Sequence, residues 1–185
     1  MALLVAALLA LATWLYLVFA NGFFWLARER DDRGEPDEPV IWPGVCAVVP
    51  ARDEADVIAR SIGGLLGQDY PGELRVILVD DGSSDGTADV ARATAAQITG
   101  RAQLDVIAGQ PLPPGWTGKL WAMAQGVERA GELDPKPEFL LLTDADIAHT
   151  PDNLRRLVAR AEAGRLVLVS LMAKLRCDTF AETML

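Results

Sequence analysis

The chain has 185 residues, a formal net charge of -9 and a pI near 4.6. This length accommodates one membrane segment and one domain, and it is small for an enzyme with two substrates. The acidic balance argues against a nucleic-acid-binding protein, which normally presents a basic face to the phosphate backbone. It does not exclude nucleotides as ligands, because a bound cation reverses the local charge.

The first 27 residues predict a transmembrane helix. Residues 2–27 contain no charged residue, and as a helix they would rise about 39 Å, enough to cross a hydrocarbon core of about 30 Å. No Lys or Arg precedes the apolar run, as one would in a signal peptide. Arg28, Arg30 and Arg33 follow it, which favours a single-pass protein of the inner (cytoplasmic) membrane with its globular domain in the cytoplasm.

A charged linker is predicted next, over residues 28–44. Its first part, residues 28–39, holds six acids, three arginines and two prolines, a composition without a core-forming pattern. We interpret it as a solvated spacer between the membrane helix and a domain over residues 45–185.

Apolar runs alternate with segments of helical spacing in this domain. The runs predict buried parallel strands at Val45–Val49, Leu74–Val79, Leu104–Ile107, Phe139–Leu142 and Leu166–Leu171. Helices are expected at Val57–Leu66, Ala88–Ile98, Gly118–Ala130 and Pro151–Ala163, the last with Thr150 as N-cap. The alternation predicts an α/β fold, with a mostly parallel sheet and helices on both faces.

Acidic loops follow three of these strands. They are residues 50–54, residues 80–87, and the pair Asp144 and Asp146. The carboxyl ends of parallel strands form the edge at which ligands bind in such sheets. Glycines and a helix cap at Ser84 or Asp85 explain much of the second loop as an ordinary turn.

The spacing of Asp144 and Asp146 indicates a metal site. Residues two apart on a strand point the same way, and two convergent carboxylates suit a hard divalent cation shared with phosphate groups. The alternative is a polar turn, in which Asp is common. His149, three residues farther on, is either a further ligand or a polar residue before a helix, and we favour the second interpretation.

Other site classes lack their signatures. The sequence has no GxGxxG after a strand and no GxxxxGK[ST] loop, which argues against a dinucleotide enzyme or a P-loop ATPase. Cys46 and Cys177 form no CxxC or Cys/His cluster, so neither a zinc site nor a disulfide framework is indicated.

Taken together, these motifs resemble family 2 glycosyltransferases of GT-A fold. The matching segments are Val48–Glu54, Val79–Thr87, Gly118–Gly126 and Asp144–Asp146. The resemblance implies that Pro50, Ala51, Glu54 and Asp81 hold the base and ribose of a nucleotide sugar. It also implies that Asp144 and Asp146 hold Mn²⁺ or Mg²⁺ against the diphosphate, with Asp146 as the direct ligand. Lys119 would either assist the phosphates or be solvated.

A narrower resemblance rests on Pro111–Ala122 combined with one N-terminal membrane helix. These features are similar to bacterial glycosyltransferases associated with hopanoid biosynthesis, which implies a polycyclic or polyisoprenoid acceptor in the membrane. Trp116 and Trp121 lie in this segment, where we expect ordinary packing rather than sugar contact.

The resemblance predicts an inverting, metal-dependent transfer of a sugar from a UDP-sugar to a membrane lipid. Family members carry an acidic catalytic base farther along the chain than Leu185, so the base is unassigned and we expect the domain to be incomplete at its C-terminus. Nothing marks Glu182 as that base. One alternative is a membrane-anchored nucleotide-sugar-binding module without turnover. Another is a phosphotransferase with Asp144 as nucleophile, ranked last because that motif usually ends the first strand.

Overall fold

The computed structural model describes residues 1–21 and 34–173, which belong to two compact units, Met1–Glu35 and Pro36–Leu185. The first unit contains the helix α1 (Ala2–Phe19). Its length and composition are those of a membrane-spanning helix, criteria that a signal sequence also meets. The helix ends eight residues before the predicted boundary at residue 27, and the arginines at positions 28, 30 and 33 lie outside the described residues.

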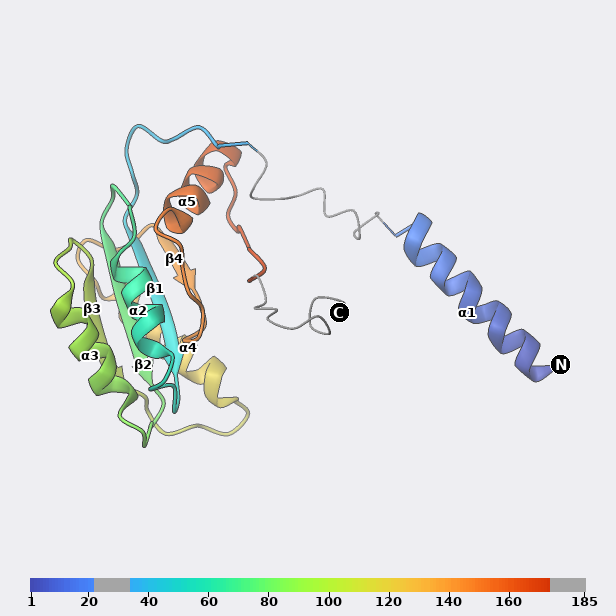
Figure 1. Ribbon diagram of the computed structural model, residues 1–185, viewed down its shortest axis with the longest axis horizontal. Coiled ribbons are helices and arrows are strands. Elements are labelled where there is room, and N and C mark those ends of the chain that lie inside the picture. Colours follow the sequence, from blue (N-terminus) through green and yellow to red (C-terminus); the bar gives the residue numbers. More distant parts are fainter. Residues whose placement is uncertain (22–33, 174–185) are drawn as a thin grey trace. The chain divides into compact units, whose positions relative to one another are not determined.

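The second unit is built on a four-stranded parallel sheet in the order β3-β2-β1-β4 (Figure 1). The strands are β1 (Val45–Ala51), β2 (Leu74–Asp80), β3 (Gln103–Ala108) and β4 (Phe139–Leu142). Val45 is in register with Leu74 of β2 and with Phe139 of β4. Every residue of the central strand β1 is buried, as expected for a parallel strand covered on both faces. The predicted α/β fold is confirmed.

Helices cover both faces of this sheet. On one face, α2 (Ile58–Leu66) buries Ile58, Ile62 and Leu65 in a core shared with α3 (Thr87–Gln97). On the other face lies α4 (Gly118–Gly131). Gly126 of α4 rests directly on the sheet, where an added Cβ would overlap the Val48 side chain and lie 3.0 Å from Val79 Cγ2. A glycine is needed there because the helix backbone approaches β1 and β2 so closely.

The helix α5 (Asn153–Gly164) begins later than the sequence predicts. Asp152, not Thr150, is at the N-cap position, and residues 150–152 form a turn in which the Asn153 N–H donates to the Thr150 carbonyl. The first turn is tied instead to the loop that follows α2, since the Leu154 N–H donates to Gln68 Oε1 at 2.8 Å. Tertiary contact therefore overrides the local start signal of Thr150 and Pro151.

The predicted strand at Leu166–Leu171 is wrong, because these residues are in neither a strand nor a helix. Val167 and Leu168 are fully or largely exposed, at 102% and 80%. An apolar run predicts burial, but a strand also needs a neighbour to pair with its backbone, and none of the described strands pairs with this segment.

Part of the predicted linker contacts the domain. Arg155 of α5 forms a two-pronged ion pair with Glu38, at 2.7 and 3.0 Å. The Trp42 ring packs edge-on against Tyr70, with ring centroids 5.4 Å apart. Residues 38 and 42 are therefore held by the globular unit, although no helix or strand forms between residues 34 and 44.

Candidate donor-binding site

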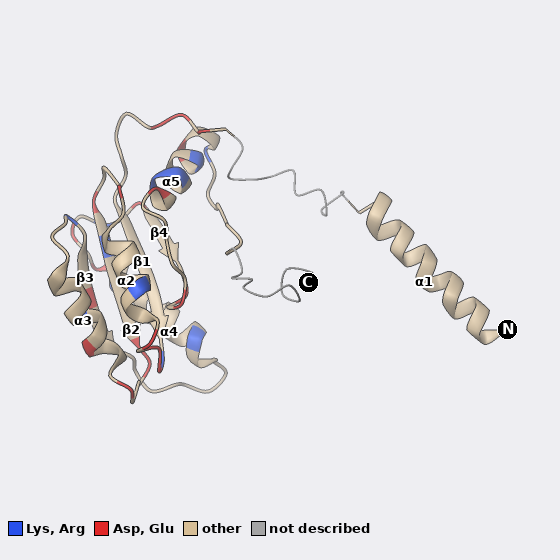
Figure 2. Ribbon diagram, viewed as in Figure 1, with Lys and Arg blue, Asp and Glu red and all other residues tan. Residues whose placement is uncertain are grey.

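A cleft of about 320 Å³ lies at the carboxyl ends of β1, β2 and β4, closed on one side by the first turn of α4. This edge is where ligands bind in parallel α/β sheets. The residues that line the cleft are Pro50, Ala51, Arg52, Glu54, Asp81, Gly118, Lys119, Ala122, Asp144, Ala145 and Asp146. All seven residues predicted to hold nucleotide sugar or metal are among them. Figure 2 shows acidic segments in the loops at this end of the sheet.

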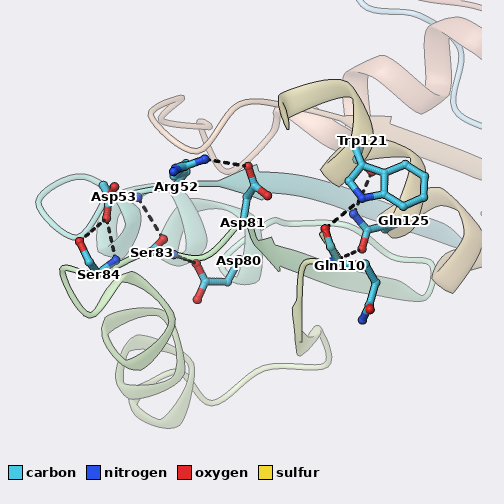
Figure 3. Close-up of polar contacts among 9 residues, drawn as sticks. All are labelled: Arg52, Asp53, Asp80, Asp81, Ser83, Ser84, Gln110, Trp121 and Gln125. Carbon is cyan, nitrogen blue, oxygen red and sulfur yellow. Dashed lines mark hydrogen bonds and ion pairs between the residues drawn. The ribbon is translucent and has the colours of Figure 1, made fainter. Parts of the chain in front are cut away.

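Hydrogen bonds join the loops after β1 and β2, and we call this set the loop clasp (residues 53–55 with residues 83–87). The Asp53 N–H donates to Ser83 Oγ at 3.0 Å, and Asp53 Oδ1 accepts from the Ser84 N–H at 2.7 Å (Figure 3). Glu54 and Ala55 donate their N–H groups to Thr87 Oγ1 and Asp85 Oδ2. The clasp holds Asp53 in a left-handed conformation, with φ of 53°, that few residues other than glycine adopt.

Two acids of the loop after β2 accept hydrogen bonds from that loop itself. Asp80 Oδ1 accepts the Ser83 N–H at 3.1 Å, and Asp85 Oδ1 accepts the N–H and hydroxyl of Thr87 at the start of α3. The bond from the Thr87 hydroxyl, with that from the Ala55 N–H, lowers the pKa of Asp85. These acids position loops. Gly86 is at the N-cap position of α3, so neither Ser84 nor Asp85 is the N-cap residue, although the Asp85 carboxylate accepts the Thr87 N–H.

Asp81 is the acid of this loop that faces the cleft. Its N–H donates to the Ala51 carbonyl at 2.9 Å, which fixes the residue beside the end of β1. Arg52 lies 3.7 Å from its carboxylate (Figure 3). An added Cβ on Gly118 would lie 3.0 Å from Asp81 Oδ2, so the first residue of α4 closely approaches the same carboxylate.

The loop after β4, residues 143–150, presents Asp144 and Asp146 and is here called the DxD loop. Lys119 Nζ lies 2.7 Å from Asp144 Oδ1, so the first turn of α4 reaches this loop as well. His149 is not among the cleft residues. Its ring nitrogens lie 3.0 Å from Thr143 Oγ1 and 3.2 Å from Asn153 Oδ1, which supports the polar-loop interpretation and not the metal ligand.

The helix α2 supports the DxD loop from below. An added Cβ on Gly64 would lie 3.0 Å from the His149 carbonyl oxygen, so the loop backbone rests on this helix. The Gln68 amide bridges the two elements, since its Nε2 donates to the Gly64 and Thr150 carbonyls at 2.9 and 2.7 Å. These contacts fix the loop without using either aspartate.

The cleft has an excess of negative charge. Four carboxylates, those of Glu54, Asp81, Asp144 and Asp146, face two basic side chains. Burial raises the pKa of Glu54, and the negative charge of Asp146 raises it further. Among the described residues, Glu54 and Asp146 form no ion pair. A diphosphate would be repelled here unless a cation accompanied it.

The donor set fits Mn²⁺ or Mg²⁺, which prefer oxygen ligands and commonly combine one or two carboxylates with substrate phosphates and water. In the part of the chain that the structure describes, no group of three or more His, Cys, Asp or Glu side chains is placed to hold a metal. Asp144 and Asp146 could contribute two of the oxygen ligands of such a cation.

Sequence reasoning missed Arg52 and Gln125 as residues that shape the site. Arg52 lies inside the matched segment Val48–Glu54, so its position was available as a signal. Gln125 is buried, with 8% of its surface exposed, and its amide bonds to the loop that precedes α4. Gln125 also lies inside a matched segment, Gly118–Gly126, but its hydrogen-bond partner is seen only in the three-dimensional contacts.

With this geometry established, comparisons with known proteins define the class. Residues 46–183 match the sequence profile described as Glycosyl transferase family 2. The chain therefore belongs to this family of glycosyltransferases.

Individual relatives agree with that class. The chain is 29% identical over 131 residues to an N-acetylglucosaminyltransferase of Mesorhizobium japonicum, a match that covers 70% of this chain and 28% of the relative. It is 28% identical over 131 residues to an undecaprenyl-phosphate mannosyltransferase of Micrococcus luteus, covering 68% and 47%. The chain thus spans less than half the length of these relatives.

Solved structures agree on the fold. The mannosyltransferase PcManGT of Pyrobaculum calidifontis, solved with GDP-Man and Mn²⁺, superposes with a TM-score of 0.59 and 26% identity, covering 84% of this chain and 42% of that one. TarS of S. aureus, residues 1–349 with UDP, gives a TM-score of 0.51 and 22% identity, covering 64% and 32%. The predicted GT-A fold is thereby confirmed.

Proposed function

We propose that this chain forms the nucleotide-sugar donor site of a metal-dependent, inverting glycosyltransferase that acts on a membrane lipid. The main support for the proposal is that one cleft is lined by four carboxylates and a lysine, namely Glu54, Asp81, Asp144, Asp146 and Lys119. Pro50, Ala51, Glu54 and Asp81 would hold the base and ribose. Asp144 and Asp146 would hold Mn²⁺ or Mg²⁺, with Lys119 beside the same phosphates.

In this reaction an acceptor oxygen bonds to the anomeric carbon of the sugar while the bond from that carbon to the diphosphate breaks. Negative charge grows on the departing diphosphate, and a divalent cation supplies the neutralising charge when bound. The chain contributes the carboxylates that hold such a cation and the ammonium of Lys119. The acceptor must lose a proton, and no described residue is assigned as its base.

The proposed classes of donor and acceptor are based on similarity to other proteins and on the apolar helix α1. UDP is the nucleotide that the sequence motifs imply, whereas the relative from Pyrobaculum calidifontis was solved with GDP-Man. A lipid acceptor is supported by the apolar helix α1 and by the relative named undecaprenyl-phosphate mannosyltransferase. A polyisoprenyl phosphate or a hopanoid alcohol is accordingly the acceptor class we propose, at the cytoplasmic membrane face.

Calorimetric binding of UDP and of GDP to the full chain in detergent micelles, with Mn²⁺ or with EDTA, tests the donor site. We expect tight binding only with metal, and a loss of about 100-fold in Asp146→Ala, the size of a charged interaction of roughly 2.7 kcal/mol. Asp89→Ala is the matched control, because Asp89 is an exposed acid on α3, away from the cleft, whose ion pair is with Arg92. Metal-independent binding that survives Asp146→Ala would refute the assignment.

Turnover is tested separately with radiolabelled UDP-sugars or GDP-mannose, and with undecaprenyl phosphate or a hopanoid alcohol in the micelles. Transfer of label to the lipid supports the glycosyltransferase. Metal-dependent nucleotide binding without transfer or hydrolysis would favour the binding module without turnover.

A further inference from the structure

Gln110, at the start of the loop between β3 and α4, is hydrogen-bonded through both its backbone N–H and its backbone carbonyl. Its N–H donates to Gln125 Oε1 at 2.7 Å, and its carbonyl accepts the Trp121 indole N–H at 3.0 Å (Figure 3). Gln125 Nε2 in turn donates to the Trp121 carbonyl at 3.1 Å. Gln125 and Trp121 of α4 are therefore hydrogen-bonded to each other, and both are hydrogen-bonded to the loop residue Gln110.

Gln110 is the point at which this loop can be fixed. Three of the next four residues are prolines, which have no N–H to donate. Within residues 111–117, all of which are described, the internal backbone hydrogen bond is that from the Trp116 N–H to the Pro113 carbonyl. Trp116 also packs on Trp121, with ring centroids 5.3 Å apart. Trp121 therefore contacts the loop at two places, Gln110 and Trp116.

The far end of the loop is the first turn of α4, which contacts both acidic loops of the cleft. Gly118 approaches Asp81, and Lys119 pairs with Asp144. Gly126 fixes the distance of α4 from the sheet, because its backbone rests on Val48 and Val79. Gln125, the residue before Gly126, links α4 to the loop that precedes its first turn.

From these contacts we infer that Gln125 is a positioning residue for the phosphate end of the donor site. Gln125 acts through its hydrogen bonds to Gln110 and Trp121. These bonds fix the first turn of α4, and so the positions of Gly118 and Lys119 beside the two acidic loops. The inference rests on the proposed function, since it takes the ligand of this end to be a nucleoside diphosphate. Gln125 itself lies outside the cleft lining and would touch neither the sugar nor the metal.

The test compares UDP with uridine on the full chain in micelles with Mn²⁺, using wild type and Gln125→Met, a variant of similar shape without the amide. We expect the affinity for UDP to fall about 5- to 10-fold, the effect of one net hydrogen bond, and the affinity for uridine to change less than about twofold. A role in folding alone would lower both equally or neither.

Two further variants keep the test decisive. Trp121→Phe keeps an aromatic ring, although a smaller one, and removes the indole N–H, so it should reproduce the selective loss of UDP affinity if Gln125→Met unfolds. Thr94→Val removes a comparable side-chain bond to the Val90 carbonyl in α3 and should leave both affinities unchanged. Selective loss in the α4 variants supports the inference.

The outcomes separate this inference from the proposed function. If wild type binds UDP with Mn²⁺ and both α4 variants bind it equally well, the positioning role of Gln125 is refuted and the donor site stands. If wild type binds neither UDP nor GDP, the proposed function fails and the inference fails with it.

Discussion

The loop clasp and the DxD loop meet at one cleft, but they use their carboxylates in opposite ways. In the clasp, Asp53 and Asp85 accept hydrogen bonds from backbone N–H groups of the facing loop. In the DxD loop, Asp144 has one ion pair, with Lys119, and Asp146 has none among the described residues. Hydrogen-bond accounting thus separates acids that build the site from acids left available for a ligand.

The difference has a physical origin. A backbone N–H buried or half-buried in a turn must find an acceptor, and a nearby carboxylate supplies it with a charge-assisted bond. The clasp loops satisfy their donors in this way. The DxD loop is instead held by Gln68, Gly64 and His149, so its carboxylates need not contribute to folding. Negative charge can then accumulate where a cation would offset it.

The largest effect on stability is expected from Asp53→Ala. The substitution removes the acceptor of the Ser84 N–H and leaves alanine in a left-handed conformation that favours aspartate. The free energy of unfolding should fall by about 1 to 2 kcal/mol, measured by urea denaturation. Asp53→Asn keeps the acceptor and tolerates the conformation, so it should lose less than about 0.5 kcal/mol. Equal losses would show that charge, not the clasp geometry, matters.

Gln68→Met should have the next largest effect, because it frees the DxD loop from α2. Three hydrogen bonds to Gly64, Thr150 and Leu154 are lost, at a net cost of about 1 kcal/mol since water replaces part of them. Urea denaturation measures the loss, and metal-dependent UDP affinity should fall with it.

The control for this variant lies on α2, the helix that Gln68 follows. The Ser61 hydroxyl is buried and has no hydrogen-bond partner in the described structure. Ser61→Ala should therefore not destabilise the protein, because an unsatisfied buried hydroxyl already costs free energy. A stability loss in Ser61→Ala as large as that in Gln68→Met would contradict the proposed support of the DxD loop.

The sequence predicts most of the fold and the edge of the sheet at which the acids lie, but not the role of each acid. Apolar runs fixed four strands, and the parallel fold then brought Glu54, Asp81 and Asp144 to one edge. The family resemblance singled out Asp81, but residue type and spacing alone do not separate it from Asp80, because neighbouring aspartates differ only in what their side chains contact. Asp80 accepts the Ser83 N–H, whereas Asp81 faces the cleft.

The incorrect predictions share one cause. The strand at 166–171 was predicted from apolar character, which reports a tendency to be buried but not the presence of a pairing strand. The start of α5 was predicted from Thr150 and Pro151, but Gln68, 86 residues from Leu154, supplies the first-turn acceptor. Long-range contacts of this kind, like that between Gln110 and Gln125, leave no local signal in the sequence.

A smaller effect, dependent on pH, is expected from Asp85→Asn in the clasp. Bonds from the Thr87 hydroxyl and the Ala55 N–H hold the pKa of Asp85 below its ordinary 3.8. Its stabilising contribution is therefore fully present above that value and is lost as the pH falls through the lower folded-state pKa. Asp85→Asn should be less stable than wild type at pH 7, and the difference should vanish in acid. Thermal unfolding against pH measures this, with Asp89→Asn as an exposed control.

The smallest change in stability is expected from Asp146→Ala in the DxD loop, within about 0.5 kcal/mol of wild type, as for an exposed side chain without partners. Its effect should instead be seen at Glu54, whose raised pKa should move toward its ordinary 4.5 when the charge of Asp146 is removed. Burial, the larger cause, should keep the pKa of Glu54 above that value.

Carboxyl ¹³C titration of Glu54 by NMR measures this shift. A raised folded-state pKa means that the stability contributed by Glu54 is present below its unfolded pKa and lost as the pH rises through the folded one. This loss should be smaller in Asp146→Ala, because one source of repulsion is gone. In the clasp, removing an acid costs stability at neutral pH, whereas here it should cost none. A Glu54 pKa unchanged by Asp146→Ala would mean that the two loops do not share one electrostatic site.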